Sequence, residues 1–282
     1  MEFMDRLKPS EVNLVIYHAN CADGFGAAYA AWRLLGERAS YVACSHGDNP
    51  PNVKGKNVII VDFSFPRDVL IKMRGDANKL LVLDHHISAK NSLEDLPYTH
   101  FDISHSGAVL AWKYFHPQSQ VPTFVKYIED RDLWKWEMDF SKEFSIFLNT
   151  VPRSFEGYAM LEDDSFLSSC IEKGKVLLEY ADIQINNICR KAIVKKMLGL
   201  NVAIVNSCNF ESEVGSILSK TCDFALIWHY DYTRDNIKVS LRSRDDAVDV
   251  SSIAAEYFGG GGHHSAAGFQ VSSYTELQNY FD

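Results

Sequence analysis

Several features that would point to particular classes of protein are missing from this sequence. The six cysteines form no CxxC pair, which argues against a zinc ribbon or a disulfide framework and favours a reducing compartment. No apolar run approaches the roughly 18 residues needed to span a bilayer, and the opening MEFMDRLKPSE lacks the apolar core of a signal peptide. We therefore expect a cytoplasmic protein that does not bind membranes.

Positive charge is also scarce. The chain has 28 Lys and Arg against 37 Asp and Glu, a formal net charge of −9. Long duplex nucleic acid is held mainly by many lysine and arginine contacts to phosphates, so this charge argues against such a partner. A short or small anionic substrate is easier to reconcile with it. At 282 residues, with 46% hydrophobic residues, the chain can form two folded domains.

The first 90 residues alternate between short apolar runs and helix-like stretches. The helix-like stretches cover residues 23–35 and 66–74. Three apolar runs have the length and continuity of strands buried on both faces: NLVIY (13–17), NVIIV (57–61) and KLLVL (79–83). This alternation predicts an α/β domain with a doubly wound parallel sheet.

The rest of the chain predicts a helical segment followed by a second α/β pattern. Helices are expected at 104–115 and 122–130, and a long, mostly helical stretch at 164–198. The second pattern comprises a strand LNVAIVN (200–206), a helix near 211–220, the strands DFALIWHY and NIKVSLRS, the segment 251–258, a glycine run and a final strand GFQV. We predict domains at 1–163 and 200–282, joined by a helical connector at 164–199.

Metal-ligand side chains follow each of the three apolar runs. NLVIY leads into His18, NVIIV into Asp62, and KLLVL into Asp84-His85-His86. Open parallel sheets place their sites at the carboxyl ends of the strands, so these side chains are expected to meet. Imidazole and carboxylate ligands suit manganese, magnesium or iron, with zinc and cobalt as alternatives. Two ions bridged by a carboxylate can bind a phosphate and activate water, and Asp62 is the candidate bridge.

Several segments resemble the motifs of one known superfamily. Those in the first half resemble successive motifs of the DHH phosphoesterases: YHANCADGFGAA (17–28), VDFS (61–64), LDHHIS (83–88) and YIEDRDLW (127–134). The segments VSLRSRD (239–245) and GGGGHHSAAGF (259–269) resemble the DHH-associated C-terminal domain that binds substrate. The superfamily includes RecJ-like exonucleases, nanoRNases, cyclic-dinucleotide phosphodiesterases and family II inorganic pyrophosphatases. The resemblance implies an active site in the cleft between a catalytic domain and a smaller substrate-binding domain.

The resemblance also implies roles for individual residues. His18 and Asp62 would help bind one divalent ion. The other would be bound by Asp23, Asp62, His85 and Asp130, with Asp132 as the competing choice to Asp130. The remaining two residues of the triplet would act on the substrate side, with His86 contacting the scissile phosphate and Asp84 orienting a neighbouring histidine.

One position departs from the family pattern. The first motif of the family usually has two aspartates separated by one residue, and here Cys21 stands in place of the first and Asp23 in place of the second. A thiolate is a softer ligand than a carboxylate and favours zinc or iron over magnesium. Three readings stay open: Cys21 ligates a metal, the first metal is held by His18 and Asp62 with water, or Cys21 is a small buried thiol.

The C-terminal glycine run is the candidate substrate-binding segment. Gly260, Gly261 and Gly262 would let the backbone come close to a phosphate, and His263 and Arg242 would add positive charge. Arg244 is a weaker candidate on the same face of the strand.

Several other residues have two readings each. Ser106 and Gly107 either offer a helix N-terminus to phosphate or cap the helix. Trp134 and Trp136 either stack a base or fill the core, and the core is favoured. The following histidines belong to no motif that indicates a site, and we interpret them as ordinary surface or core residues: His46, His100, His105, His116 and His229.

We therefore expect a metal-dependent, exonuclease-type phosphodiesterase that uses two divalent ions, most naturally Mn²⁺, with Mg²⁺, Co²⁺, Fe²⁺ and Zn²⁺ as alternatives. Its expected substrates are short single-stranded oligonucleotides or (cyclic) dinucleotides. The alternatives are a catalytically weakened nucleotide-binding regulatory module, suggested by Cys21, and inorganic pyrophosphatase, which the C-terminal glycine motif disfavours. The sequence leaves the oligomeric state, the metal and the exact substrate open.

Overall fold

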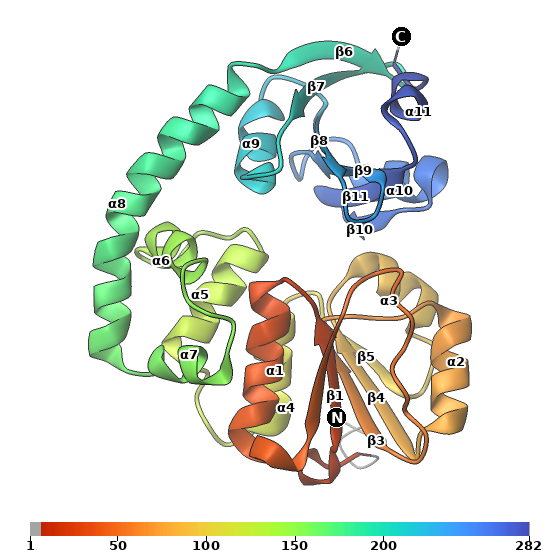
Figure 1. The fold of residues 1–282 in the computed structure, drawn as a ribbon, viewed down its shortest axis with the longest axis vertical. Helices are drawn as coiled ribbons and strands as arrows, with labels where there is room; N and C mark the ends of the chain where they lie inside the picture. The colour runs from red at the N-terminus through yellow and green to blue at the C-terminus, as the bar shows by residue number, and fades with distance from the viewer. Residues whose placement is uncertain (1–6, 282) are drawn as a thin grey trace. The chain divides into compact units, whose positions relative to one another are not determined.

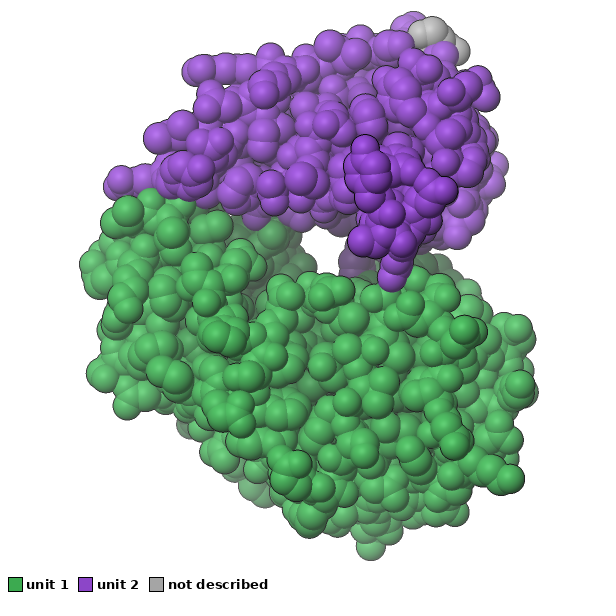
Figure 2. Space-filling view, viewed as in Figure 1, with its two compact units in different colours: residues 1–178 green, residues 179–282 purple. Residues whose placement is uncertain are grey.

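A computed structural model describes residues 7–281 of the chain, which divides into two compact units, Met1–Leu178 and Glu179–Asp282 (Figures 1 and 2). Most of the opening segment that lacks signal-peptide character falls within residues 1–6, outside the described residues. Among residues 7–281, none of the helices is both long and apolar enough to cross a bilayer. The division into two domains and a connector at 164–199 stays a prediction.

The first unit is built on a five-stranded sheet in which all neighbouring strands run parallel, in the order β2-β1-β3-β4-β5. The strands are β1 (Leu14–His18), β2 (Ser40–Cys44), β3 (Asn57–Val61), β4 (Lys79–Asp84) and β5 (Thr99–Phe101). The three apolar runs are β1, β3 and β4, which occupy the centre of the sheet. The predicted parallel-sheet α/β domain is confirmed.

Both faces of this sheet are covered, which explains why its central strands are apolar throughout. On one face, Val15 and Ile59 pack with helices α1 (Ala22–Leu35) and α4 (Gly107–Phe115). On the other, Ile16 and Ile60 pack with α2 (Arg67–Asp76) and α3 (Ile87–Leu93). Figure 1 shows these two helix pairs on opposite sides of the sheet. Alternate residues of one strand thus enter different cores.

Three further helices extend the core on the α1 and α4 side. They are α5 (Thr123–Asp132), α6 (Ser141–Leu148) and α7 (Phe155–Met160), and they bury Phe124, Phe144 and Tyr158. Short 3-10 turns lie at Pro9–Glu11 and Gly36–Arg38. The end of α5 brings the segment YIEDRDLW (127–134) to the sheet edge.

The long helix α8 (Asp164–Cys189) ends earlier than expected. The sequence suggested helix to residue 198, whereas residues Ile193–Met197 form strand β6. Two β-branched residues, Ile193 and Val194, open this strand. It lies at the edge of the second sheet with four of its five residues exposed, so it lacks the alternating burial that marks a strand in a sequence.

The second unit contains a six-stranded mixed sheet in the order β10-β11-β9-β8-β7-β6. Its other strands are β7 (Leu200–Asn206), β8 (Phe224–Asp231), β9 (Asn236–Arg242), β10 (Gly261–His263) and β11 (Ala266–Val271). Only the β7–β8 pair is parallel. Helices α10 (Val250–Phe258) and α11 (Tyr274–Gln278) contribute to the core on one face, and α9 (Glu211–Leu218) packs on β8 and β9.

Candidate metal centre

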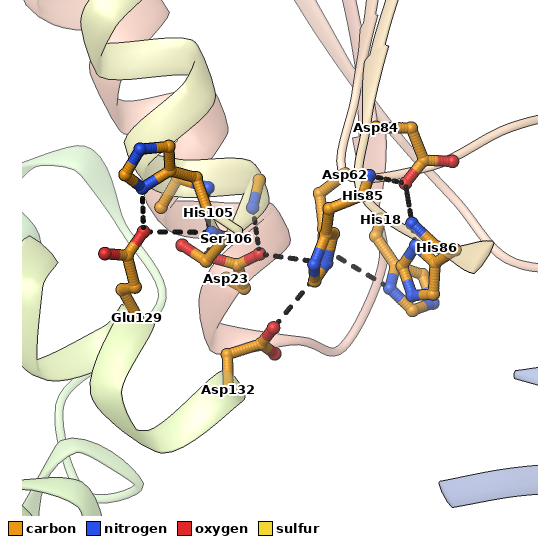
Figure 3. A network of polar contacts seen from close by, with 12 residues as sticks. His18, Asp23, Asp62, Asp84, His85, His86, His105, Ser106, Glu129 and Asp132 are labelled. Carbon is orange, nitrogen blue, oxygen red and sulfur yellow. Dashed lines mark hydrogen bonds and ion pairs between the residues drawn. The ribbon is translucent and has the colours of Figure 1, made fainter. Parts of the chain in front are cut away.

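The carboxyl ends of β1, β3 and β4 bring histidines and aspartates to one edge of the first sheet. Tyr17 pairs with Val61, and Val61 with Leu83, so the residues that follow each of these positions are level with one another. Those following residues are His18, Asp62 and Asp84, and His85 and His86 come directly after. The strand register therefore brings these residues to one edge of the sheet, and Figure 3 shows their side chains gathered there.

Asp62 lies at the centre of this cluster and its two oxygens face different histidines. Oδ1 lies 3.1 Å from His85 Nε2, and Oδ2 lies 3.5 Å from His18 Nδ1. The residue is 1% exposed, and its Oδ2 atom accepts no hydrogen bond. A buried carboxylate oxygen without a donor carries a large desolvation cost, which a cation would offset.

The backbone at Asp62 is also unusual. Its φ angle is +55°, in the left-handed region that non-glycine residues seldom adopt. A Cβ added at Gly107, at the start of α4, would lie 2.3 Å from Asp62 Cβ. Close packing of a glycine against a strained aspartate holds the carboxylate in place, and strain of this kind concentrates at functional sites.

A second group of possible ligands surrounds the other side of His85. Its Nε2 atom lies 3.7 Å from Asp23 Oδ2 and 3.5 Å from Asp132 Oδ2. The ligand atoms of these three residues all lie within 4.8 Å of one another, as do those of His18, Cys21 and Asp62. Figure 3 shows Asp23 and Asp132 both directed toward His85.

Asp23 is held by the N-terminus of a helix. The residue lies in the first turn of α1 and is 1% exposed, and its carboxylate accepts hydrogen bonds from Gly107 N (2.6 Å) and Ala108 N (2.9 Å) of α4. The α4 N-terminus therefore binds a protein carboxylate. Ser106 is the N-cap, its hydroxyl accepting from Val109 N at 3.4 Å, as the capping interpretation of that segment predicts.

The structure places Asp132, and not Asp130, beside His85. Asp130, predicted from the sequence as the ligand, accepts hydrogen bonds from the backbone amides of Glu137 (2.9 Å) and Met138 (3.4 Å) and so holds the loop after α5. Asp132, at the last position of α5, approaches His85 instead. Residues two positions apart on an α-helix are rotated by roughly 200° about its axis, so these two carboxylates point to opposite sides of α5.

Asp84 organises the pair of histidines that follows it. It is 1% exposed, and its Oδ1 atom lies 2.7 Å from His86 Nδ1 and accepts from His85 N at 2.7 Å. Ser64 Oγ donates to Asp84 Oδ2 at 2.6 Å. A carboxylate held by a hydroxyl and bound to Nδ1 fixes both the tautomer and the direction of the His86 ring.

The pKa values in the cluster reflect an excess of buried negative charge. Burial and the neighbouring carboxylates of Asp62 and Asp132 raise the pKa of Asp23 well above its usual range. Burial likewise raises the pKa of Asp132. The pKa of His85 rises to about 10: burial opposes its charge, but the hydrogen bond to Asp62 and the carboxylates of Asp132 and Asp23 favour it. Bound protons therefore neutralise part of the negative charge of these carboxylates when no cation is bound.

The pKa values of Asp62 and Asp84 are lowered, in contrast to those of Asp23 and Asp132. Burial acts to raise the pKa of each, but the neighbouring imidazoles of His18 and His85 keep the pKa of Asp62 well below its usual range. His86 and Ser64 lower the pKa of Asp84 in the same way, and Asp84 raises the pKa of His86 against the effect of burial. Asp62 is therefore charged at neutral pH. The donor set of oxygens and imidazoles around it fits divalent cations.

One neighbour of the cluster was not recognised in the sequence. His46 was read as an ordinary histidine, but its ring lies 5.7 Å from that of His18 and 5.1 Å from that of Phe63. Burial, with His18 and His86 nearby, lowers its pKa. The residue follows β2 at the same sheet edge, so recognition of β2 would have identified it.

The residues proposed for substrate binding lie in the second unit. Arg242 ends β9, where its Nη2 atom donates to Ser212 Oγ at 2.9 Å. The local backbone requires glycine at two positions of the glycine run. A Cβ at Gly260 would lie 2.2 Å from Gly268 O, and Gly262 has a φ of +148°. With Gly261 and His263, Gly262 forms the short strand β10. Substrate binding by these residues stays a prediction.

Three weaker candidates, Arg244 in the second unit and Trp134 and Trp136 in the first, are in contact with protein groups. Arg244 donates to the carbonyl of Ser219 and lies 3.3 Å from Asp246 Oδ1. Trp134 and Trp136 form an edge-to-face pair with centroids 5.1 Å apart, and Arg131 lies over the Trp134 ring at 4.3 Å.

Comparisons with known proteins agree with this architecture. The DHHA1 domain family matches residues 212–282. An uncharacterized protein, R106, of Acanthamoeba polyphaga mimivirus is 31% identical over 287 residues, which cover 93% of this chain and 68% of that protein. Oligoribonuclease NrnB of Bacillus subtilis is 27% identical over 175 residues, 56% of this chain and 42% of NrnB, so the match spans less than half of that enzyme.

A solved structure shares the fold. The pGpG-specific phosphodiesterase PggH of Vibrio cholerae superposes with a TM-score of 0.50 at 13% identity, covering 95% of each chain. The match to the DHHA1 family and the similarity to these relatives confirm the resemblance seen in the motifs, since the Asp84-His85-His86 triplet follows the expected strand of the expected sheet. The chain belongs to the DHH superfamily of phosphoesterases and ends in a DHHA1 domain.

Proposed function

We propose that this protein is a metal-dependent phosphodiesterase that hydrolyses short oligonucleotides or (cyclic) dinucleotides. The observation that carries the proposal is the position of Asp62 between two groups of ligands. One of its oxygens faces His85 and the other, which accepts no hydrogen bond, faces His18. A carboxylate with two such oxygens suits the bridging position between two cations.

The residues divide between two cation positions. His18 and Asp62 would serve the first. Asp23, Asp62, His85 and Asp132 would serve the second. When bound, two divalent ions of this kind lower the pKa of water between them and neutralise charge on a phosphate. Mn²⁺ is the expected ion, with Mg²⁺, Co²⁺, Fe²⁺ and Zn²⁺ as alternatives.

His86 would act on the substrate. Its Nδ1 atom is engaged by Asp84 at 2.7 Å, so Nε2 is the atom that would meet a phosphate oxygen. Asp84 favours the protonated form of this ring by raising its pKa, and a protonated imidazole can donate a hydrogen bond to negative charge that develops on phosphorus oxygens. Asp84 itself would be a positioning residue, held by Ser64.

The substrate class follows from charge and from the relatives. A net charge of −9 disfavours a long nucleic acid, because few cationic side chains are available to bind its phosphates. NrnB is named as an oligoribonuclease, and PggH as specific for the dinucleotide pGpG. Arg242, His263 and the glycines 260–262 of the DHHA1 domain are the proposed contacts to the far end of such a substrate.

A panel of substrates tests the proposal. Protein freed of metal should release mononucleotides from dinucleotides and short oligonucleotides after Mn²⁺ is added, and excess chelator should abolish the release. Mg²⁺, Co²⁺ and Zn²⁺ are assayed in parallel, and pyrophosphate is included to measure the less favoured pyrophosphatase activity. If no phosphodiester in the panel is turned over with any of the four ions, the proposal is wrong.

A nucleotide-binding regulatory module is the alternative, and the presence of Cys21 in place of an aspartate is the observation that favours it. It predicts stoichiometric nucleotide binding without hydrolysis and about one metal ion per chain. Elemental analysis that finds two equivalents in an active preparation would reject it.

A further inference from the structure

We propose that Cys21 is a metal ligand, so that the first cation position has a histidine, a thiolate and a carboxylate. This inference rests on the metal-dependent function proposed above. With Cys21 as a ligand, the two cation positions differ in their ligand atoms. The first has nitrogen, sulfur and oxygen ligands, and the second has nitrogen and oxygen ligands only. The family pattern, with an aspartate in place of Cys21, would make the two positions chemically alike.

The turn between β1 and α1 brings Cys21 to the site. His18 is the last residue of β1, and Cys21 is the N-cap of α1. Between them Asn20 adopts a left-handed conformation with a φ of +58°, which asparagine tolerates better than most residues. A Cβ at Gly24 would lie 2.3 Å from His18 O, so the first turn of α1 packs directly on the end of the strand.

The Cys21 side chain does not perform the usual task of its position. N-cap residues are usually serine, threonine, aspartate or asparagine, whose side-chain oxygen accepts from the helix backbone. Cys21 makes no such side-chain cap hydrogen bond. Burial and the nearby carboxylates raise the pKa of the Cys21 thiol, and the amide of Gly24 in the first turn of the helix acts against that rise.

The three possible ligand atoms are close enough for one ion. Sγ of Cys21, a ring nitrogen of His18 and a carboxylate oxygen of Asp62 all lie within 4.8 Å of one another. Ligands at the usual zinc distances of 2.0 to 2.3 Å in a tetrahedral arrangement are roughly 3.5 Å apart, so small side-chain movements would close this set around an ion.

An independent observation points to a cation at the same place. The Oδ2 atom of Asp62 is buried and accepts no hydrogen bond, and it faces His18 at 3.5 Å. Asp62 is 1% exposed. A charged oxygen in that setting needs a positive partner, and the thiol beside it can supply a second negative ligand by losing its proton to solvent when the ion binds.

The donor set determines which ions would prefer the position. Thiolate and imidazole select zinc, cobalt or ferrous iron over magnesium, whereas the Asp23, His85 and Asp132 group suits manganese or magnesium as well. We therefore expect one thiophilic ion at the Cys21 position. The two positions should also differ in affinity and load in sequence.

Cobalt titration of the metal-free protein tests the inference by absorption spectroscopy rather than by activity. Wild-type protein should develop a sulfur-to-cobalt charge-transfer band in the near ultraviolet that saturates at one equivalent per chain. Cys21→Ser and Cys21→Asp should bind cobalt without this band. The matched control is Cys208→Ser, which changes the exposed cysteine of the second unit and should keep the band.

Zinc affinity gives a second readout. Cys21→Ser should weaken the tighter zinc site by more than the roughly 10- to 100-fold that loss of an outer partner costs. Cys21→Asp should keep two metal equivalents and shift the preference toward Mn²⁺. Circular dichroism and thermal unfolding of both variants establish that they are folded.

The outcomes separate this inference from the proposed function. A wild-type protein that hydrolyses phosphodiesters but shows no thiolate band, or fails to bind cobalt, overturns the Cys21 assignment and leaves the function standing. A band that persists in Cys21→Ser also overturns it. A band that Cys21→Ser removes, in a protein that hydrolyses no phosphodiester, supports the ligand and rejects the function.

Discussion

Replacement of Asp62 with asparagine is the sharpest test of the site. The substitution keeps the size of the side chain, and asparagine tolerates the left-handed φ of +55° at this position. The low pKa of Asp62 means that the change removes one negative charge at neutral pH. It also removes the carboxylate that lies between both groups of ligands, so both cation positions should fail together.

The expected loss of turnover is at least about 1,000-fold. Removal of a single group that stabilises developing charge costs roughly 100- to 1,000-fold in kcat, and loss of a shared ligand affects two ions. A 1,000-fold loss corresponds to about 4 kcal/mol in the activation free energy. Single-turnover hydrolysis of a dinucleotide at saturating Mn²⁺ measures the effect.

Thermal unfolding supplies a second measurement. An ion at 100 times its Kd stabilises the folded state by about 2.7 kcal/mol, which is about 5 to 10 °C for a domain of this size. Wild-type protein should show a rise in Tm of this order on addition of Mn²⁺, and Asp62→Asn should lose it. The rise is measured for each protein against its own metal-free form, because the substitution also removes the carboxylate that His18 and His85 approach.

Asp235→Asn is the matched control. Asp235 is another aspartate with a left-handed backbone, φ +52°, in the turn between β8 and β9. Its replacement should leave both turnover and the metal-induced rise in Tm unchanged. If Asp62→Asn retains turnover within about tenfold of wild type, or keeps the full rise in Tm, the reasoning about a shared carboxylate is refuted.

Other changes probe separate parts of the protein. Asp132→Asn should reduce turnover at least about 100-fold with little change in Tm, because its carboxylate approaches His85. Asp130→Asn should instead lower Tm, because it weakens the hydrogen bonds that hold the loop after α5. Kinetics and calorimetry of both variants distinguish the two effects, and the reverse pattern would favour Asp130 as the ligand. Gly107→Ala should cost about 1 to 3 kcal/mol of stability and weaken Mn²⁺ binding, because its methyl group would meet Asp62; an unchanged Tm contradicts this. His263→Ala should raise KM for a dinucleotide with a smaller effect on kcat, and a pure loss of kcat would argue against a binding role.

The sequence predicted the centre of the first sheet well and its edges poorly. The strands β1, β3 and β4 are buried on both faces, so their apolar runs are visible without a structure. The edge strand β2 is partly exposed and reads SYVAC, a run with a tyrosine, an alanine and a cysteine in place of the valines, isoleucines and leucines of the central strands. Because β2 was missed, His46 was not connected with the sheet edge where it lies.

The fourth motif shows a different limit. Asp130 and Asp132 both fit the pattern of a carboxylate near the end of a helix, and residue type does not distinguish them. What decides is which side of α5 faces the sheet edge and where the following loop needs an acceptor for its amides. Both depend on tertiary packing, which one sequence does not encode in a readable way.

The hydrogen bonds from Gly107 and Ala108 give Asp23 a structural role in addition to its proposed role as a metal ligand. The same carboxylate ties α1 to α4, so any replacement of Asp23 strips two buried amides of their acceptor and confounds folding with metal loss. Asp132 lies at the end of α5 with its side chain 27% exposed, and no backbone amide of residues 7–281 donates to its carboxylate. Attempts to alter the metal preference of the proposed site should therefore begin at the periphery of the cluster, where a ligand can be changed without weakening the contact between α1 and α4.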